Sequence, residues 1–236
     1  MDALDRVAGP ALTLLTLVDT SLARNGAAAD DPVWPLARRL RALPGDAVAA
    51  FVAVRPTPLV AAGTAIGPHL DRYAEAADAL AVHRDWSGAA AQAYDAGRQA
   101  LAARLVGGPD PGAVSHAGRL AATAAYAEAT ARWVSLSRAA LARTLAEVLG
   151  SADAVTVTTG SGAGTGAGTG ADGPGGPAGA DAAARIAVPV LSVLVEIVEH
   201  GESLAAWWGP LLAPTDAAGP VDEAPVRPDG SIRLRY

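Results

Sequence analysis

The sequence predicts an all-α fold, in which an antiparallel helical hairpin is extended to a helical bundle. Ala, the best helix former, supplies 59 of the 236 residues, whereas aromatic residues, which favour strands, supply only 4%. Apolar residues recur every three or four positions over several long stretches, which is the period of one helix face. A Gly-rich stretch and several Pro clusters separate these stretches, so we expect distinct helices joined by short breaks.

Residues 1–56 are predicted to form an N-terminal helical segment. Apolar residues from Leu4 to Leu22 keep the helical spacing, with Pro10 as a point where the helix can bend. The segment ends at Arg55, because a residue that precedes a proline is pushed away from the α region.

Residues 57–150 are predicted to form a helical hairpin followed by a long third helix. The two stretches 57–82 and 88–106 are each amphipathic, and the connection between them is short, so they should pack as antiparallel neighbours. Six apolar residues are predicted to form the seam between them: Ile66, Leu70, Tyr73, Tyr94, Leu101 and Leu105.

The third helix, 113–149, carries two apolar stripes, and Trp133, Leu136 and Ala140 form the second of them. A helix that is apolar on two sides contacts two neighbours, and the N-terminal and C-terminal helices are the candidates. Three regions complete the predicted organisation: a flexible Gly-rich linker at 151–181, a C-terminal helix at 182–208 and a Pro-rich tail at 209–236.

The composition excludes several chemistries. The chain has no Cys and no Lys, so thiolate, disulfide, Schiff-base and phosphate-loop lysine chemistry are absent. Its net charge of −6 argues against a nucleic-acid partner. The glycines of 160–170 lack the following helix and strand of a dinucleotide site, and the four His share no face with metal-ligand spacing. We therefore predict no enzymatic activity, no cofactor and no metal.

The motif Trp86-Ser87-Gly88 lies between the two predicted hairpin helices. There an indole can cover the apolar end of the hairpin, and a glycine lets the chain reverse without a Cβ clash. Trp86 and Gly88 are therefore the residues predicted to hold the turn.

With Ala90, Ala91, Ala93 and Tyr94 after it, this motif resembles the Trp-x-Gly (WxG) helical-hairpin proteins of the type VII (Esx) secretion pathway of actinobacteria, in a long, Ala-rich form. The resemblance covers residues 57–106. It implies that the hairpin pairs with another helical hairpin, as a homodimer or heterodimer in a four-helix bundle, or binds the type VII export machinery. It also implies secretion without a cleaved signal peptide.

The sequence departs from that family in one motif. Members commonly carry an export signal in which Asp or Glu follows a Tyr by four residues, but Arg98 occupies that place after Tyr94. Our leading hypothesis is a non-enzymatic helical interaction protein of this secretion pathway. One alternative is a cytoplasmic structural or scaffold bundle, and another is a membrane-active protein that acts through residues 186–212. The apolar run of 186–198 is too short to cross a bilayer, so we predict no integral membrane span.

Overall fold

The computed structural model describes residues 1–81, 87–108, 115–162 and 177–212, and within these ranges it contains eight α-helices and no strand. The predicted all-α bundle is therefore confirmed. The helices are α1 (Ala3–Asn25), α2 (Val33–Leu40), α3 (Pro44–Val52), α4 (Thr57–Leu80), α5 (Ala89–Val106), α6 (His116–Leu149), α7 (Ala152–Gly162) and α8 (Pro177–Leu212).

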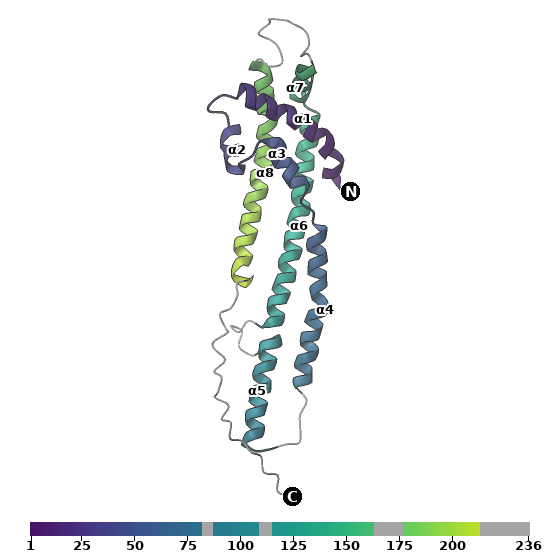
Figure 1. Cartoon of the computed structure of the whole chain (residues 1–236), viewed down its shortest axis with the longest axis vertical. Helices are drawn as coiled ribbons and strands as arrows, with labels where there is room; N and C mark the ends of the chain where they lie inside the picture. The colour runs from purple at the N-terminus through teal and green to yellow at the C-terminus, as the bar shows by residue number, and fades with distance from the viewer. Residues whose placement is uncertain (82–86, 109–114, 163–176, 213–236) are drawn as a thin grey trace, which may run out of the picture.

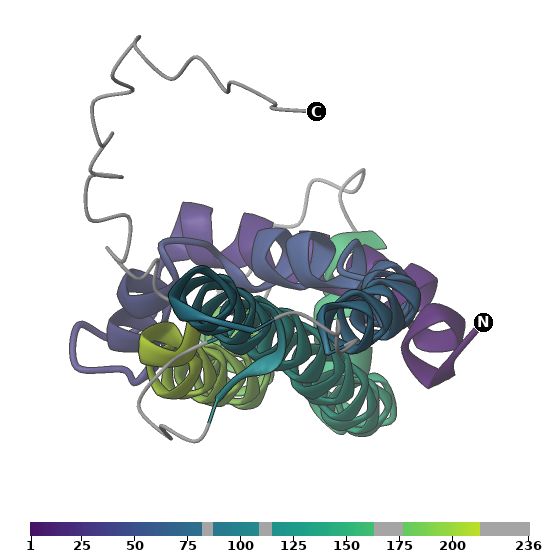
Figure 2. The ribbon, with the colours of Figure 1, turned by 90° about the horizontal axis from the view of Figure 1, so that it is seen from below.

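The molecule is elongated, and α6 runs through much of its length (Figure 1). We call the part built from α1, α2, α3, α7, residues 131–149 of α6 and residues 178–197 of α8 the head. The stalk is the part built from α4, α5 and residues 116–130 of α6. Viewed along the long axis, α6 lies between α4 and α8 (Figure 2). At 1.5 Å per residue the 34 residues of α6 span about 51 Å, enough to belong to both parts.

The core lies in the head. Of the buried apolar side chains of the described residues, all but Ala91 belong to it. They come from one face of α1, from α2, α3 and α7, and from the facing sides of α6 and α8. Because buried apolar area is the main source of stability, most of the folding free energy comes from the head.

Helix α1 begins with a capping box. The Asp2 carboxylate accepts a hydrogen bond from the Asp5 amide at 3.0 Å, and the Asp5 carboxylate accepts one from the Asp2 amide at 3.1 Å. These bonds satisfy amide groups that have no partner within the helix. Leu15 and Val18 on the inner face are fully buried, and the helix continues through the exposed Pro10.

Helix α3 is capped by a side chain from α1. Its N-cap residue, Leu43, cannot accept a hydrogen bond through its side chain, and the Asp19 carboxylate of α1 accepts from the Gly45 amide at 3.0 and 3.3 Å. A Cβ atom on Gly45 would lie 2.5 Å from Asp19 Oδ2, so only glycine fits there without a shift. Burial raises the pKa of Asp19 to about 6.

The predicted linker differs from the structure in its first and last parts. Helix α7 occupies residues 152–162, because Ala154 and Val157 are apolar enough to pack against the head, where each is 6% exposed. Helix α8 begins at Pro177 and includes 209–212, the start of the predicted tail. The rest of the linker, 163–176, and the tail residues 213–236 lie outside the described residues.

The stalk confirms the two predicted hairpin helices, which run in opposite directions (Figure 1). Helix α4 also packs along the first half of α6. A Cβ atom added to Gly63 would lie 3.5 Å from the Ala124 carbonyl oxygen, so the two helices approach closely there. None of the 24 residues of α4 is buried. The stalk therefore holds together through small residues and leaves much of its apolar surface uncovered.

Candidate functional site

Of the predicted turn motif, the structure describes Ser87 and Gly88. Gly88 is the N-cap residue of α5 and has a φ of 110°, a backbone conformation that favours glycine. A Cβ atom there would meet nothing within 4 Å, so backbone conformation and not space explains the glycine. Trp86 lies outside the described residues, and its role at the turn stays a prediction.

The seam residues of α4 are half-buried. Ile66, Leu70 and Tyr73 all face the rest of the stalk without being enclosed by it. The Tyr73 ring stacks on the His116 ring of α6, with 6.2 Å between the ring centroids. The face of α4 predicted to meet α5 therefore also meets the start of α6.

The pairing face of α5 is shifted by one residue from the predicted face. Leu105 is half-buried, but Tyr94 and Leu101 are 46% and 47% exposed, which corrects their predicted place in the seam. Ala91, at 5% exposure, is the buried residue of this helix. The prediction assumed that the largest apolar side chains make the contact, whereas the small side chain lets the helices approach. Tyr94 and Leu101 are consequently presented on the surface.

Arg98 links the two hairpin helices. Its guanidinium donates hydrogen bonds to the Leu80 carbonyl oxygen at the end of α4 and to the Asp95 carboxylate at 2.7 Å. A cation next to the last carbonyl groups of a helix is stabilising, because those groups lack partners within the helix. This contact fixes the end of α4 against the middle of α5.

Arg138 is the most buried charged residue of the described chain, at 1% exposure, and the sequence reasoning missed it. Its five N–H groups donate to the Asp2 carboxylate at 2.6 and 3.2 Å, to Asp5 at 2.7 Å, and to the carbonyl oxygens of Val52 and Val54 at 3.0 and 2.9 Å. Every donor of the guanidinium is thus used.

The Arg138 cluster joins α6, the start of α1 and the end of α3. Hydrogen bonding from Arg138 lowers the pKa of Asp2 to about 2, and hydrogen bonding from Arg55 lowers the pKa of Asp5. The carboxylates in turn raise the pKa of Arg138. All charges are paired, so the cluster is suited to holding three helices together. One sequence feature could have revealed it: Arg138 occupies the stripe position between Val134 and Leu141, where an apolar residue is expected.

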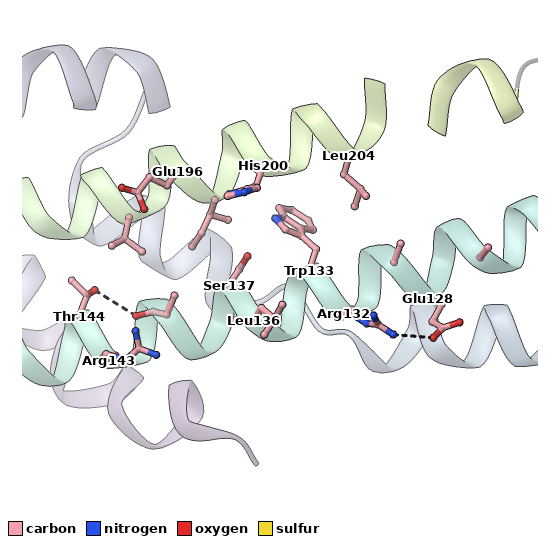
Figure 3. Close-up of a pocket in the computed structure, with 15 residues that line it drawn as sticks. Glu128, Arg132, Trp133, Leu136, Ser137, Arg143, Thr144, Glu196, His200 and Leu204 are labelled. Atoms are coloured by element: carbon pink, nitrogen blue, oxygen red, sulfur yellow. Dashed lines mark hydrogen bonds and ion pairs between the residues drawn. The ribbon is translucent and has the colours of Figure 1, made fainter. Parts of the chain in front are cut away.

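A groove lies between α6 and α8, along the second predicted stripe of α6. Figure 3 shows Trp133 between the two helices and Leu204 on the facing side. The cavity has a volume of about 770 Å³, and Leu136 is 66% exposed along it. Helix α8 therefore covers only one edge of the stripe. The apolar walls are formed by Ala129, Leu136, Ala140, Val193, Ile197 and Leu204.

One buried polar group in the groove lacks a hydrogen-bond partner within the described part of the chain. The Trp133 indole packs over Gly201, where a Cβ would lie 2.7 Å from the ring, and its buried Nε1–H has no acceptor. Ser137, at 7% exposure, also lines the groove. Buried polar groups are normally satisfied, so the indole N–H makes the floor of the groove unlike an ordinary core.

Of the segment considered for membrane activity, 186–212, residues 186–197 belong to the head, whereas none of residues 198–212 is buried. Ile186, Val190 and Leu191 are at most 1% exposed, while Trp207, at 65%, remains on the surface beside Trp208. Elsewhere in the described residues, the helical stretch Pro44–Leu80 has the length and apolar composition to cross a bilayer, and 6% of its most apolar window is buried. In the structure this stretch consists of α3 and α4, separated by residues 53–56.

The described residues contain no group of three or more His, Asp or Glu side chains placed to hold a metal ion. In its described residues the protein is an all-α helical bundle, with exposed apolar side chains on α4 and α5 and along the groove between α6 and α8. A comparison of the chain with protein-family models, with curated proteins and with solved structures finds no match.

Proposed function

We propose that this protein is a non-enzymatic helical interaction protein that binds another helical hairpin through the stalk, as a substrate of a type VII secretion pathway or as the partner of one. The observation that carries the proposal is α4, whose 24 residues include no buried side chain although one face is apolar. An amphipathic helix needs a partner for its apolar face. Within the described chain, α5 and α6 supply only part of that cover.

The exposed apolar side chains of the stalk give the proposed partner its contacts. Val60 on α4 is 55% exposed, and Tyr94, Leu101 and Val106 on α5 are between 42% and 47% exposed. Apolar anchors of this kind dominate helix-to-helix recognition when a partner buries them. The resemblance of Trp86-Ser87-Gly88 to the Trp-x-Gly turn adds the class of partner, a second helical hairpin.

An export assay tests this proposal. The chain is produced in a type VII-competent strain with and without a working export ATPase, and the culture filtrate and the cell lysate are immunoblotted. We expect the chain in the filtrate only when the ATPase works. A Val60→Glu, Leu101→Glu double variant should lose export, because carboxylates on the stalk block hairpin pairing, whereas Arg72→Glu, on the polar face of α4, should keep it.

The alternative is a structural or scaffold bundle that stays in the cytoplasm. The lack of a Tyr-based export signal after α5 favours it. Retention of the wild-type chain in the lysate under both conditions would contradict the secretion proposal and support this alternative.

A further inference from the structure

We propose that a second copy of this chain covers the groove between α6 and α8 and forms a two-fold symmetric dimer. This interface is distinct from the stalk surface of the proposed function. Leu136 projects from the side of α6 opposite Val134, which is buried in the head, so the groove faces away from α1. Leu136 is the largest exposed apolar side chain in the groove and would be its central anchor.

The register of the two helices locates the symmetry axis. The contacts Trp133 with Gly201 and Tyr126 with Trp208 are seven residues apart on both helices, so α6 and α8 run antiparallel at a constant register. In that register Val198 lies at the level of Leu136. A two-fold axis that lies in the interface, perpendicular to both helices at this level, places each helix against the same helix of the partner in the opposite direction.

Two of the three charged side chains of α6 that line the cavity, Glu128 and Arg143, are complementary about this axis, and the third, Arg132, contacts Glu128 in its own chain. Glu128 lies about 12 Å before Leu136 and Arg143 about 10 Å after it, both along the cavity. The axis therefore places Glu128 opposite the partner's Arg143, and Arg143 opposite the partner's Glu128. Among the described residues Glu128 makes one ion pair, an exposed contact of 3.4 Å with Arg132, at 73–74% side-chain exposure, so it can also pair across the interface.

Polar side chains along α8 follow the same symmetry. Glu196 and His200 both line the cavity and lie two residues before and after Val198. The axis set by α6 therefore places Glu196 opposite the partner's His200 as well. A surface that places a charge pair on α6 and a carboxylate opposite an imidazole on α8 about one axis suits a dimer of identical subunits, whereas an unrelated partner needs no such symmetry.

Sedimentation velocity of the full chain and its variants tests the dimer. We expect a dimer for the wild type, a monomer for Leu136→Glu, and a dissociation constant raised about tenfold or more for Arg143→Glu. The double variant Glu128→Arg, Arg143→Glu exchanges the two charges and should restore the dimer. Circular dichroism confirms that each variant is folded, which the exposure of these positions leads us to expect.

Leu101→Glu, on the stalk, is the matched control and should remain dimeric. A monomeric wild type, or a dimer that persists in Leu136→Glu, would overturn the inference. A dimer lost in Leu101→Glu and kept in Leu136→Glu would likewise overturn it, while supporting pairing through the stalk. Retention of the wild-type chain in the lysate, with this dimer still formed, would count against the proposed function alone.

Discussion

Replacing Arg138 by Met should destabilise the head strongly. Met keeps an unbranched apolar stem in the same space but removes all five hydrogen-bond donors of the guanidinium. The carboxylates of Asp2 and Asp5, which hold α1 to α6 through this side chain, lose their buried counter-charge. The carbonyl groups at the end of α3 lose their donor in the same step.

The magnitude follows from the exposure of the partners. Removing one member of a buried ion pair costs about 3 to 5 kcal/mol when the remaining charge stays buried. The side chain of Asp5 is 17% exposed and that of Asp2 is 45% exposed, so water replaces part of the lost hydrogen bonding. We therefore expect a loss of about 3 kcal/mol, at the lower end of the range, which corresponds to a fall of about 1 to 3 M in the urea midpoint.

Urea unfolding followed by far-ultraviolet circular dichroism measures this loss. Arg72→Met is the matched control, because Arg72 is exposed on α4 and the same substitution there should change the free energy of unfolding by about 0.5 kcal/mol or less. Equal midpoints for the two variants would show that the Arg138 cluster does not hold the head together.

Three further predictions concern packing and pH. Gly201→Ala places a Cβ 2.7 Å from the Trp133 ring and should lower the free energy of unfolding, measured by thermal unfolding, by about 1 to 3 kcal/mol. Gly9→Ala is the control, because Gly9 has open space around it, and it should raise the free energy of unfolding by about 0.5 to 1 kcal/mol. A gain at both sites would contradict the close approach of Gly201 to Trp133. The pKa of Asp19 is about 6 in the folded chain and ordinarily 3.8, so the wild type loses stability as pH rises from about 4 to 6. Asp19→Asn should therefore have the higher urea midpoint at neutral pH and no advantage below pH 4. An advantage that does not depend on pH would refute the raised pKa of Asp19. Because the pKa of Asp2 is lowered to about 2, its contribution to the free energy of unfolding is complete above about pH 4 and is lost as pH falls towards 2. The fall in urea midpoint between pH 4 and 2 that comes from Asp2 should be absent in Asp2→Asn. Equal pH dependence in the variant and the wild type would count against the pairing of Asp2 with Arg138.

The sequence predicts the helices well where one apolar stripe faces one core. The bounds of α4 agree within two residues with the predicted 57–82, and α1 contains the whole predicted apolar run from Leu4 to Leu22, because long periodic stretches and the break at Arg55 determine them. The two stripes of α6 were also predicted. What periodicity could not show is that a charged residue, Arg138, completes the first stripe, since its burial depends on carboxylates more than 130 positions away.

The predicted seam was less accurate than the helices that form it. In α5 the residues Tyr94 and Leu101 were placed in the seam because they are large and apolar, yet Ala91 is the residue that is buried. In an Ala-rich helix nearly every face is apolar, so the sequence pattern does not distinguish the face that packs from the face that remains exposed. Helix α7 was missed for a related reason, because two small apolar residues were enough to fold part of a Gly-rich region.

The division between a cored head and an almost coreless stalk gives the chain two levels of cooperativity. Amide groups in α4 and α5 can exchange with solvent through openings that leave α1 and the buried half of α8 intact. A binding event on the stalk would therefore slow exchange there by orders of magnitude without changing the protection of the head. Part of the binding free energy would go into ordering α4 and α5, while the head stays folded whether or not a partner is bound.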